Sequence, residues 1–158
     1  MPAKSKMNKP EYLYIKNNQL GVHEDAEKIV KVIAGKFEKA EGPEKGHNVD
    51  PIYFHVILEE GKEFKCDVPD GHNSFVYLLA GDLSIGENKH DKTSNSNLIL
   101  LDRGDKLIVK ANKKSEFLFI AGKPIGEPIA RGGPFVMNTK AEILQAVQDY
   151  HNGTFAKY

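Results

Sequence analysis

The residues of this sequence that could bind a transition metal are six histidines and the carboxylates near them. No two histidines form an H-x-H pair or an i, i+4 pair. A catalytic metal site needs at least three nitrogen, oxygen or sulfur ligands that converge on one point. Strands and turns could bring four of these groups together: His47, His55, His72 and Asp67. We treat this set only as the fallback candidates for an iron site. The simpler expectation is that His55 is a strand residue and His72 a turn residue, without a metal between them.

Other kinds of catalytic chemistry have little support in the sequence. Cys66 is the only cysteine, so no internal disulfide can form and a reducing compartment is expected. A nucleophilic thiol needs a base and an electropositive setting, and the stretch KEFKCDV supplies neither. The carboxylates of Glu59, Glu60, Asp67 and Asp70 stand near turns, where exposed acids are common. No glycine-rich phosphate loop opens a helix, so the sequence does not predict nucleotide binding.

The composition predicts a folded domain and argues against two classes of partner. The chain has 158 residues, 40% of them hydrophobic, which is the size of one domain with a real core. It carries 22 basic and 22 acidic residues, and only Arg103 and Arg131 are arginine. We therefore expect no direct contact with nucleic acid and no membrane association. The start, MPAKSKMNKP, lacks an apolar signal region, so we expect a cytoplasmic protein (or a nuclear one in a eukaryote) that is not secreted.

Short strand-like segments separated by turn residues dominate the chain. In IYFHVILE, alternate residues from Ile52 to Leu58 are apolar, which is typical of a half-buried strand. The turns contain GPEKGHN, DGHN, AGDL and RGD, and KHDKTSNSN at 89–97 reads as a polar loop. Many short strands with regular turns predict an all-β sandwich or barrel. The expected strands lie within 12–15, 27–35, 52–61, 62–69, 73–86, 97–111 and 116–122.

One good helix follows an unusual glycine-rich stretch near the end of the chain. In TKAEILQAVQDYHNG, Thr139 is a suitable N-cap and Glu142 completes a capping box. Before it stands PIARGGPFVMNT, which we interpret as a structural corner, with an interaction surface as the alternative. Arg131 is expected to fix the corner by hydrogen bonds, while the glycines and the proline turn the backbone. The residues assigned to this structural or interface role are Arg131, Gly132, Gly133, Pro134, Phe135 and Met137.

The C-terminal run FLFIAGKPIGEPIARGGPFVMNTKAEILQAVQDYHNGTF closely resembles the end of pirin-family proteins. The segments FVYLLAGDLSIG and LILLDRGDKLIVKA resemble the second barrel of a pirin, and PAKSKMNKPEY resembles the stretch that links its two domains. The resemblance implies a single cupin-type double-stranded β-helix, a jelly-roll barrel, with a short C-terminal α-helix. It also implies a linker-like polar tail at 1–11 and a cupin domain of the pirin C-terminal type at 12–158.

Pirins contain two cupin barrels, and the first carries the histidines and glutamate that bind iron. We expect that barrel to be absent here. If a cupin metal motif is aligned from Gly61, its two histidine positions fall on Asp67 and Pro69, and its glutamate position on Asn73 or Ser74. The histidine of the second motif falls near Ser115. Only Asp67 could bind a metal well, and one ligand does not make a site. No cofactor is therefore expected in this domain.

The resemblance leads to one preferred function and two alternatives. The preferred function is a non-catalytic structural or interaction domain that supports a metal-binding partner barrel. Its expected partner is an N-terminal pirin-type cupin domain or a regulatory protein, and an isolated domain of this kind could also form a homodimer. The first alternative is a metal-dependent dioxygenase of the quercetin type that uses the fallback residues. The second alternative is a cupin that binds a small molecule in its barrel.

Overall fold

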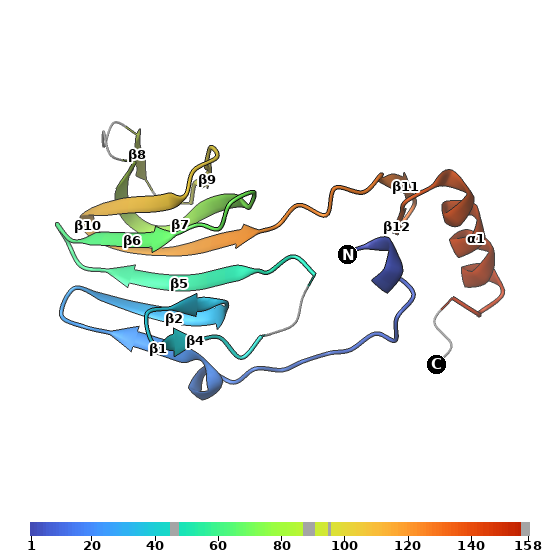
Figure 1. Ribbon diagram of the computed structural model, residues 1–158, viewed down its shortest axis with the longest axis horizontal. Coiled ribbons are helices and arrows are strands. Elements are labelled where there is room, and N and C mark those ends of the chain that lie inside the picture. Colours follow the sequence, from blue (N-terminus) through green and yellow to red (C-terminus); the bar gives the residue numbers. More distant parts are fainter. Residues whose placement is uncertain (45–47, 87–90, 95, 156–158) are drawn as a thin grey trace. The chain divides into compact units, whose positions relative to one another are not determined.

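The structure, a computed structural model, describes residues 1–44, 48–86, 91–94 and 96–155. The chain divides into two compact units, which are described separately (Figure 1). One unit comprises Ile15–Pro124 and contains the barrel. The other comprises Met1–Tyr14 together with Ile125–Tyr158 and contains the helix. The first fourteen residues are thus grouped with the C-terminal segment, and the backbone N–H of Ala3 donates a hydrogen bond to Glu127 Oε2 at 2.7 Å.

The barrel unit is built from antiparallel strands that follow a short 3-10 helix at Asn17–Gln19. The main sheet has the order β1-β2-β5-β10-β7-β8, with β6 paired to β10 and β9 paired to β7. Strands β3 and β4 form a separate small hairpin. The strands are β1 (Gly21–Glu24), β2 (Lys28–Ala34), β3 (Lys36–Phe37), β4 (Ala40–Glu41), β5 (Ile52–Leu58), β6 (Glu63–Asp67), β7 (Asn73–Ile85), β8 (Asp91–Ser94), β9 (Leu98–Leu100) and β10 (Lys106–Gly122).

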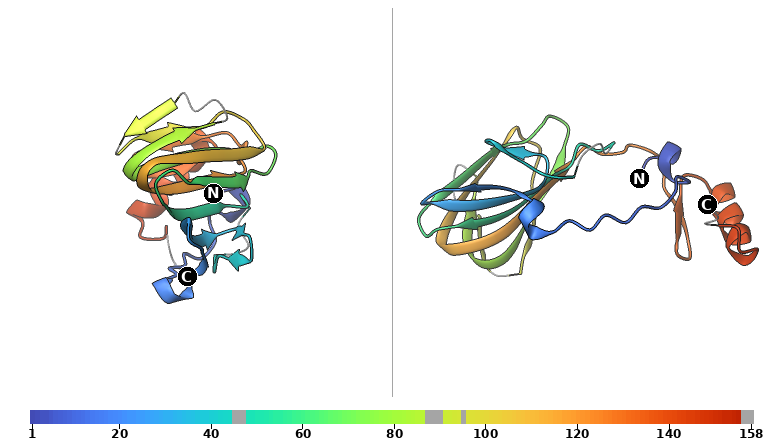
Figure 2. Two further views of the ribbon diagram at one scale, coloured as in Figure 1. Left: turned by 90° about the vertical axis from the view of Figure 1, so that its left-hand side faces the viewer. Right: turned by 90° about the horizontal axis from the view of Figure 1, so that it is seen from below.

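Two long strands, β7 and β10, take part in both layers of the barrel. The second half of β10 and the first half of β7 lie with β1, β2, β5 and β9, and we call this the six-stranded layer. The first half of β10 and the second half of β7 lie with β6 and β8, and we call this the four-stranded layer. Figure 2 shows these strands wrapping around a common interior. This arrangement confirms the predicted cupin-type barrel.

The bend between the two layers is fixed by a close contact between Gly81 and Ser115. The register of β7 against β10 is irregular between Ala111 and Phe117. There the hydroxyl of Ser115 donates to the carbonyl of Lys113 at 2.7 Å and accepts from the backbone N–H of Asp82 at 3.0 Å. Gly81 has a φ of +103°, and a Cβ on it would lie 2.2 Å from Ser115 Oγ. Only glycine fits at this position. A side chain here would collide with Ser115, and any other residue would be strained at this positive φ.

Side chains of alternating residues fill the space between the two layers. On β5, Phe54, Val56 and Leu58 are completely buried and the residues between them are partly exposed, as the alternation predicts. The layers meet through aromatic contacts, such as that between Phe64 on β6 and Phe117 in the second half of β10, with ring centroids 5.7 Å apart. Burial of these side chains is the main stabilising term for the barrel.

Three predictions about the strands are wrong: one strand is absent, one was predicted as a loop, and one is divided differently. Residues 12–15 form no strand and Tyr12 is 90% exposed, because no other strand pairs with this apolar run. The polar segment at 91–94, predicted as a loop, forms β8, an edge strand that pairs only with β7 among the described residues. The segments predicted at 97–111 and 116–122 are divided differently, since β10 runs without interruption from Lys106 to Gly122.

The second unit contains the helix and a small hairpin. Its elements are a 3-10 helix (Ala3–Ser5), β11 (Ala130–Gly132), β12 (Phe135–Met137) and α1 (Lys140–His151). The predicted capping box is confirmed, because Glu142 N–H donates to Thr139 Oγ1 at 3.2 Å and Thr139 N–H donates to Glu142 Oε2 at 2.7 Å. None of the helices in the described part of the chain is long and apolar enough to cross a membrane.

Candidate functional site

His55 lies in the middle of β5 with its side chain on the outer face of the six-stranded layer. Its neighbours Phe54 and Val56 point into the barrel, so His55 points away from the interior. The ring N–H of His55 donates to Glu116 Oε1 on β10 at 2.6 Å. The imidazole is thus already bound to a carboxylate outside the barrel, where a cupin metal site would not lie.

His72 occupies the turn between β6 and β7 and is 8% exposed. Its Nε2–H donates to the backbone carbonyl of Asp50 at 3.0 Å, which ties this turn to the segment before β5. The other ring nitrogen, Nδ1, is buried and has no hydrogen-bond partner among the described residues. A single unpartnered nitrogen supplies one potential ligand, which is too few for a metal site.

The positions that a cupin metal motif would use are occupied by unsuitable or otherwise engaged groups. Asp67 ends β6 with a side chain that is 90% exposed, and one carboxylate oxygen lies 3.8 Å from Lys106 Nζ. Pro69 is exposed on the turn after it, and Asn73 and Ser74 are the first two residues of β7. Ser115, the remaining motif position of interest, is buried and uses its hydroxyl to hold the bend of β10.

The fallback metal set is therefore not brought together in the described part of the chain. No three His, Cys, Asp or Glu side chains converge there in a way that could hold a metal ion. His47 lies outside the described residues. The residues present do not fit the iron that the family resemblance assigns to a cupin barrel.

The interior of the barrel is filled by large side chains. Phe54, Phe64, Phe117 and Phe119 are all completely buried. Phe64 and Phe117 contact edge to face with centroids 5.7 Å apart, and Phe54 lies 6.1 Å from Phe119. A ligand-binding cupin needs a cavity in this place. The filled interior argues against the alternative of a small-molecule site inside the barrel.

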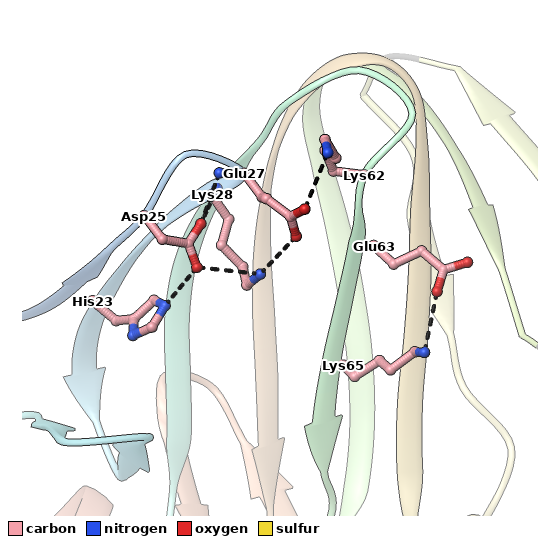
Figure 3. A network of polar contacts seen from close by, with 7 residues as sticks. All are labelled: His23, Asp25, Glu27, Lys28, Lys62, Glu63 and Lys65. Carbon is pink, nitrogen blue, oxygen red and sulfur yellow. Dashed lines mark hydrogen bonds and ion pairs between the residues drawn. The ribbon is translucent and has the colours of Figure 1, made fainter.

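Charged residues form a network at one end of the barrel, around the turn between β1 and β2 (Figure 3). Asp25 accepts hydrogen bonds from the backbone N–H groups of Glu27 and Lys28 at 2.7 and 2.9 Å and from the ring of His23 at 3.0 Å. These bonds, led by that from Glu27, hold the pKa of Asp25 well below its usual value. Lys62 Nζ lies 3.0 Å from Glu27 Oε1 and links this turn to the start of β6. The network lies at the surface and stabilises two turns.

Cys66 is protected from reaction by its surroundings. Its thiol packs against the buried core from β6. Burial, with a smaller effect from the Asp67 carboxylate, raises the pKa of Cys66 to about 12. The thiolate is the nucleophilic form, so this side chain is unsuited to covalent catalysis.

The glycine-rich stretch forms the β11–β12 hairpin and the approach to α1. Gly133 has a φ of +55° at the first of the two loop residues, with Pro134 after it. A Cβ on Gly132 would lie 2.4 Å from Ile143 Cγ2 on α1, so glycine allows the hairpin to pack closely against the helix. The two glycines thus allow a close contact with α1 and a positive φ in the hairpin loop.

The hydrogen bonds expected for Arg131 are not made to any described residue. Arg131 is exposed on β11, where its backbone is opposite Val136. The corner is held instead by Asn138, whose Nδ2 donates to Glu127 Oε2 at 2.8 Å and to the carbonyl of Pro128 at 3.0 Å. Sequence analysis missed Asn138. The available signal was the dipeptide Asn-Thr before a capped helix, since Asn at that position can bond to nearby backbone.

An open groove of about 590 Å³ lies in the same unit as this hairpin. Phe135 is half-buried beside it and contacts Phe155 and Tyr150 with ring centroids 4.9 and 5.9 Å away. Met137, expected at an interface, is 8% exposed and largely covered within the unit. The groove is lined by Met1, Lys6, Pro134, Phe135, Val136, Met137, Tyr150 and Phe155. Its walls are mainly apolar, and Lys6 and Tyr150 are their ionisable side chains.

Comparison with known proteins identifies the family domain. The family model that describes the pirin C-terminal cupin domain matches residues 53–156. A pirin-like protein from Caulobacter vibrioides is 36% identical over 157 residues, which are 98% of this chain and 56% of the relative. Human pirin is 34% identical over 154 residues, covering 95% of this chain and 52% of the relative.

Solved structures give the same result for the fold. A quercetin 2,3-dioxygenase from Acinetobacter baumannii superposes with a TM-score of 0.86 at 30% sequence identity, covering 99% of this chain and 55% of that protein. The protein GK1651 from Geobacillus kaustophilus superposes with a TM-score of 0.73 at 26% identity and 81% coverage of this chain. The chain spans about half the length of the relatives that it matches.

Proposed function

Because this chain belongs to the pirin family and carries its C-terminal cupin domain, we propose that it is a non-catalytic barrel that supports a metal-binding partner barrel. The partner would be an N-terminal pirin-type cupin domain. In a two-barrel protein the chemistry would take place in that partner, and this domain would contribute stability and position. The quercetin 2,3-dioxygenase activity named for the Acinetobacter protein would then belong to the part of that protein that this chain does not span.

The observation that carries the proposal is that the potential metal ligands are hydrogen-bonded to other groups or exposed to solvent, away from the barrel interior. His55 is hydrogen-bonded to Glu116 on the outer face, and His72 donates Nε2–H to a backbone carbonyl. Asp67 is almost fully exposed. At the place where a cupin would hold its metal, the described barrel has a packed interior of phenylalanines. These groups would need large movements before three of them could bind one ion at about 2.0–2.2 Å.

A supporting barrel also fits the chemistry of the remaining surface. The only cysteine has a raised pKa and so a low reactivity. The formal net charge is zero, which supports a protein partner over nucleic acid. We place the protein in a reducing compartment, the cytoplasm or the nucleus, because a lone thiol suits such a setting.

The experiment that tests this function is the metal content of the purified chain, measured by elemental analysis after production with iron, zinc and manganese supplied. A value near zero per chain is expected. A metalloprotein of known metal content, produced in parallel, controls for metal supply. A value near one per chain that falls in both His55→Ala and His72→Ala would overturn the proposal and restore the dioxygenase alternative. Metal that stays bound in both variants would also overturn it and would direct attention to His47.

A further inference from the structure

The unit that contains α1 has a hollow of a size suited to a small molecule. The groove described above measures about 590 Å³, and sites that bind small molecules typically measure about 300–1,000 Å³. Its walls come from four parts of one unit: the N-terminal segment, the β11–β12 hairpin, α1 and the segment after α1. The groove is therefore formed within a single compact unit. It is distinct from the barrel interior, which phenylalanine side chains fill.

Large apolar side chains line the groove without being fully covered. Met1, Val136 and Tyr150 are 72%, 52% and 63% exposed. The ring of Phe135 contacts the rings of Tyr150 and Phe155, so an aromatic cluster forms part of the wall. Aromatic rings pack well against a further ring, and methionine side chains adapt to irregular shapes. These walls suit a ligand with a flat, apolar ring system.

One positive charge lies at this apolar surface. The ammonium group of Lys6 donates to the carbonyl of Val136 at 3.4 Å, which leaves two of its three N–H donors for other partners. Lys6 forms no ion pair with a carboxylate of the described residues. The phenol of Tyr150 lines the same groove and can donate a further hydrogen bond. The groove therefore combines apolar walls with donors suited to an anion.

The acidic residue that interacts with Lys6 is engaged at the helix cap. Glu142 Oε2 accepts hydrogen bonds from the backbone N–H groups of Asn138 and Thr139 and from the Thr139 hydroxyl, at 2.9, 2.7 and 3.1 Å. These bonds, led by that from Asn138, hold the pKa of Glu142 below its usual value, and Lys6 adds a smaller effect. Glu142 and Asp149 line a smaller adjoining hollow and not the groove itself. The charge of Lys6 thus remains available to a bound anion.

We propose that the groove binds a small aromatic carboxylate, with its ring system against the exposed apolar walls and its carboxylate on Lys6. Charge complementarity selects an anion, because a neutral ligand of the same shape would cover the ammonium group without giving it a partner. The volume and the single charge suit a small molecule with one carboxylate. This site is independent of the proposed function, because it lies in the other unit and involves no metal.

The binding experiment uses naphthoate as the probe and the full chain as the protein. The isotope-labelled chain is titrated with naphthoate and followed by the NMR signals of its backbone amides. We expect saturable binding with a Kd on the order of 1 mM, because an open groove gives a ligand of this size few contacts. The largest shifts should occur at Phe135–Met137 and at Tyr150, while the amides of β5 stay unchanged.

Two pairs of variants test the charge and the location. Lys6→Met should weaken binding of naphthoate about threefold to fivefold, while Lys4→Met, which changes an exposed lysine outside the groove, should leave the Kd unchanged. Val136→Asp places a negative charge in the groove and should weaken binding at least about tenfold. Ile129 is 69% exposed in the same unit but does not line the groove, so Ile129→Asp should leave the Kd unchanged.

The neutral amide of the same ring system, naphthamide, should bind at least about threefold more weakly than naphthoate. Equal Kd values for the two compounds, or equal effects of Lys6→Met and Lys4→Met, would overturn the anion site. Shifts centred on the barrel strands would place the ligand elsewhere and would also overturn it. Groove signals that change on dilution of the unliganded chain would show a second copy as the occupant, with the same consequence. The metal content of the chain, which tests the proposed function, has no bearing on these outcomes.

Discussion

The two outer faces of the barrel differ sharply although they share the strands β7 and β10. On the six-stranded layer, apolar residues such as Tyr77, Leu118 and Ile120 occupy the outward positions. On the four-stranded layer the outward positions of β6 are Glu63, Lys65 and Asp67. The same alternation that fills the core therefore produces one charged surface and one apolar surface.

The difference indicates which of the two outer faces is suited to contact with water. A sheet that faces solvent on one side has a polar outer face, and the four-stranded layer follows this rule with ion pairs such as Lys65–Glu63 at 3.1 Å. The six-stranded layer does not follow it. Large exposed apolar patches on soluble domains are typical of contacts with other proteins. The contrast within a single barrel is the strongest structural support for a partner domain.

The largest effect is expected from neighbouring residues that point in opposite directions on β10. Phe117→Ala should lower the free energy of unfolding by about 3–5 kcal/mol, because it removes a fully buried ring from the core. Leu118→Ala should lower it by about 1 kcal/mol or less in the isolated chain. Urea unfolding followed by circular dichroism measures both. A loss of several kcal/mol in Leu118→Ala would mean that the outer face belongs to the fold of the barrel itself.

The orientation of β6 can be tested through its thiol. Because the pKa of Cys66 is raised to about 12, its thiolate fraction at pH 8 is on the order of 10⁻⁴. An ordinary thiol with a pKa of about 9 has a thiolate fraction of about 10⁻¹ at the same pH. Alkylation by iodoacetamide should therefore be roughly 10³-fold slower in the folded chain than in urea. Rapid alkylation of the folded chain would show that Cys66 points outward. The charged outer face of the four-stranded layer would then be wrongly assigned.

The contrast between the faces was partly readable from the sequence. Alternation from Ile52 to Leu58 predicts one buried face of β5, and the structure confirms it. The same stretch also contains Tyr53 and Ile57 at the alternate positions, so the sequence already showed apolar residues on the outer face of β5. Alternation alone does not state whether such residues are covered. The extent of the apolar face depends on the order of the strands, which places Tyr53, Ile120 and Phe75 in one row. That order depends on pairings between residues far apart in the chain.

The candidate site illustrates the same limit. The strand position of His55 and the turn position of His72 were predictable, but the partner of His55 is Glu116, sixty-one residues away. Asn138 was missed because its importance depends on Glu127, which reaches it across the hairpin. Arg131, which was expected to fix this corner, is exposed on β11, and no local signal in the sequence indicated that Asn138 would bond Glu127 instead. Local signals were sufficient only where the interaction is local, as in the capping box at Thr139.

The helix cap provides an internal reference that should leave both faces of the barrel unchanged. Thr139→Ala removes the hydroxyl that accepts from Glu142 N–H and should cost the helix about 0.5–2 kcal/mol. Hydrogen exchange of the α1 amides should accelerate, while exchange in β5 and β10 stays as it was. Thr139→Ser keeps an N-cap hydroxyl and serves as the control. Faster exchange in the barrel strands would mean that the two units unfold together and that the faces cannot be probed independently.

The smallest expected difference concerns one pair of polar side chains on each face. His55 and Glu116 are 2.6 Å apart with side chains 21% and 42% exposed, whereas Lys106 and Asp67 are 3.8 Å apart and 53% and 90% exposed. Solvent and salt screen the second pair more strongly, so double-mutant cycles should give a coupling of about 0.5–1 kcal/mol for the first pair and about zero for the second. The variants are His55→Ala with Glu116→Gln, and Lys106→Ala with Asp67→Asn. Equal couplings would show that the two faces are equally solvated, which would weaken the case for a covering layer.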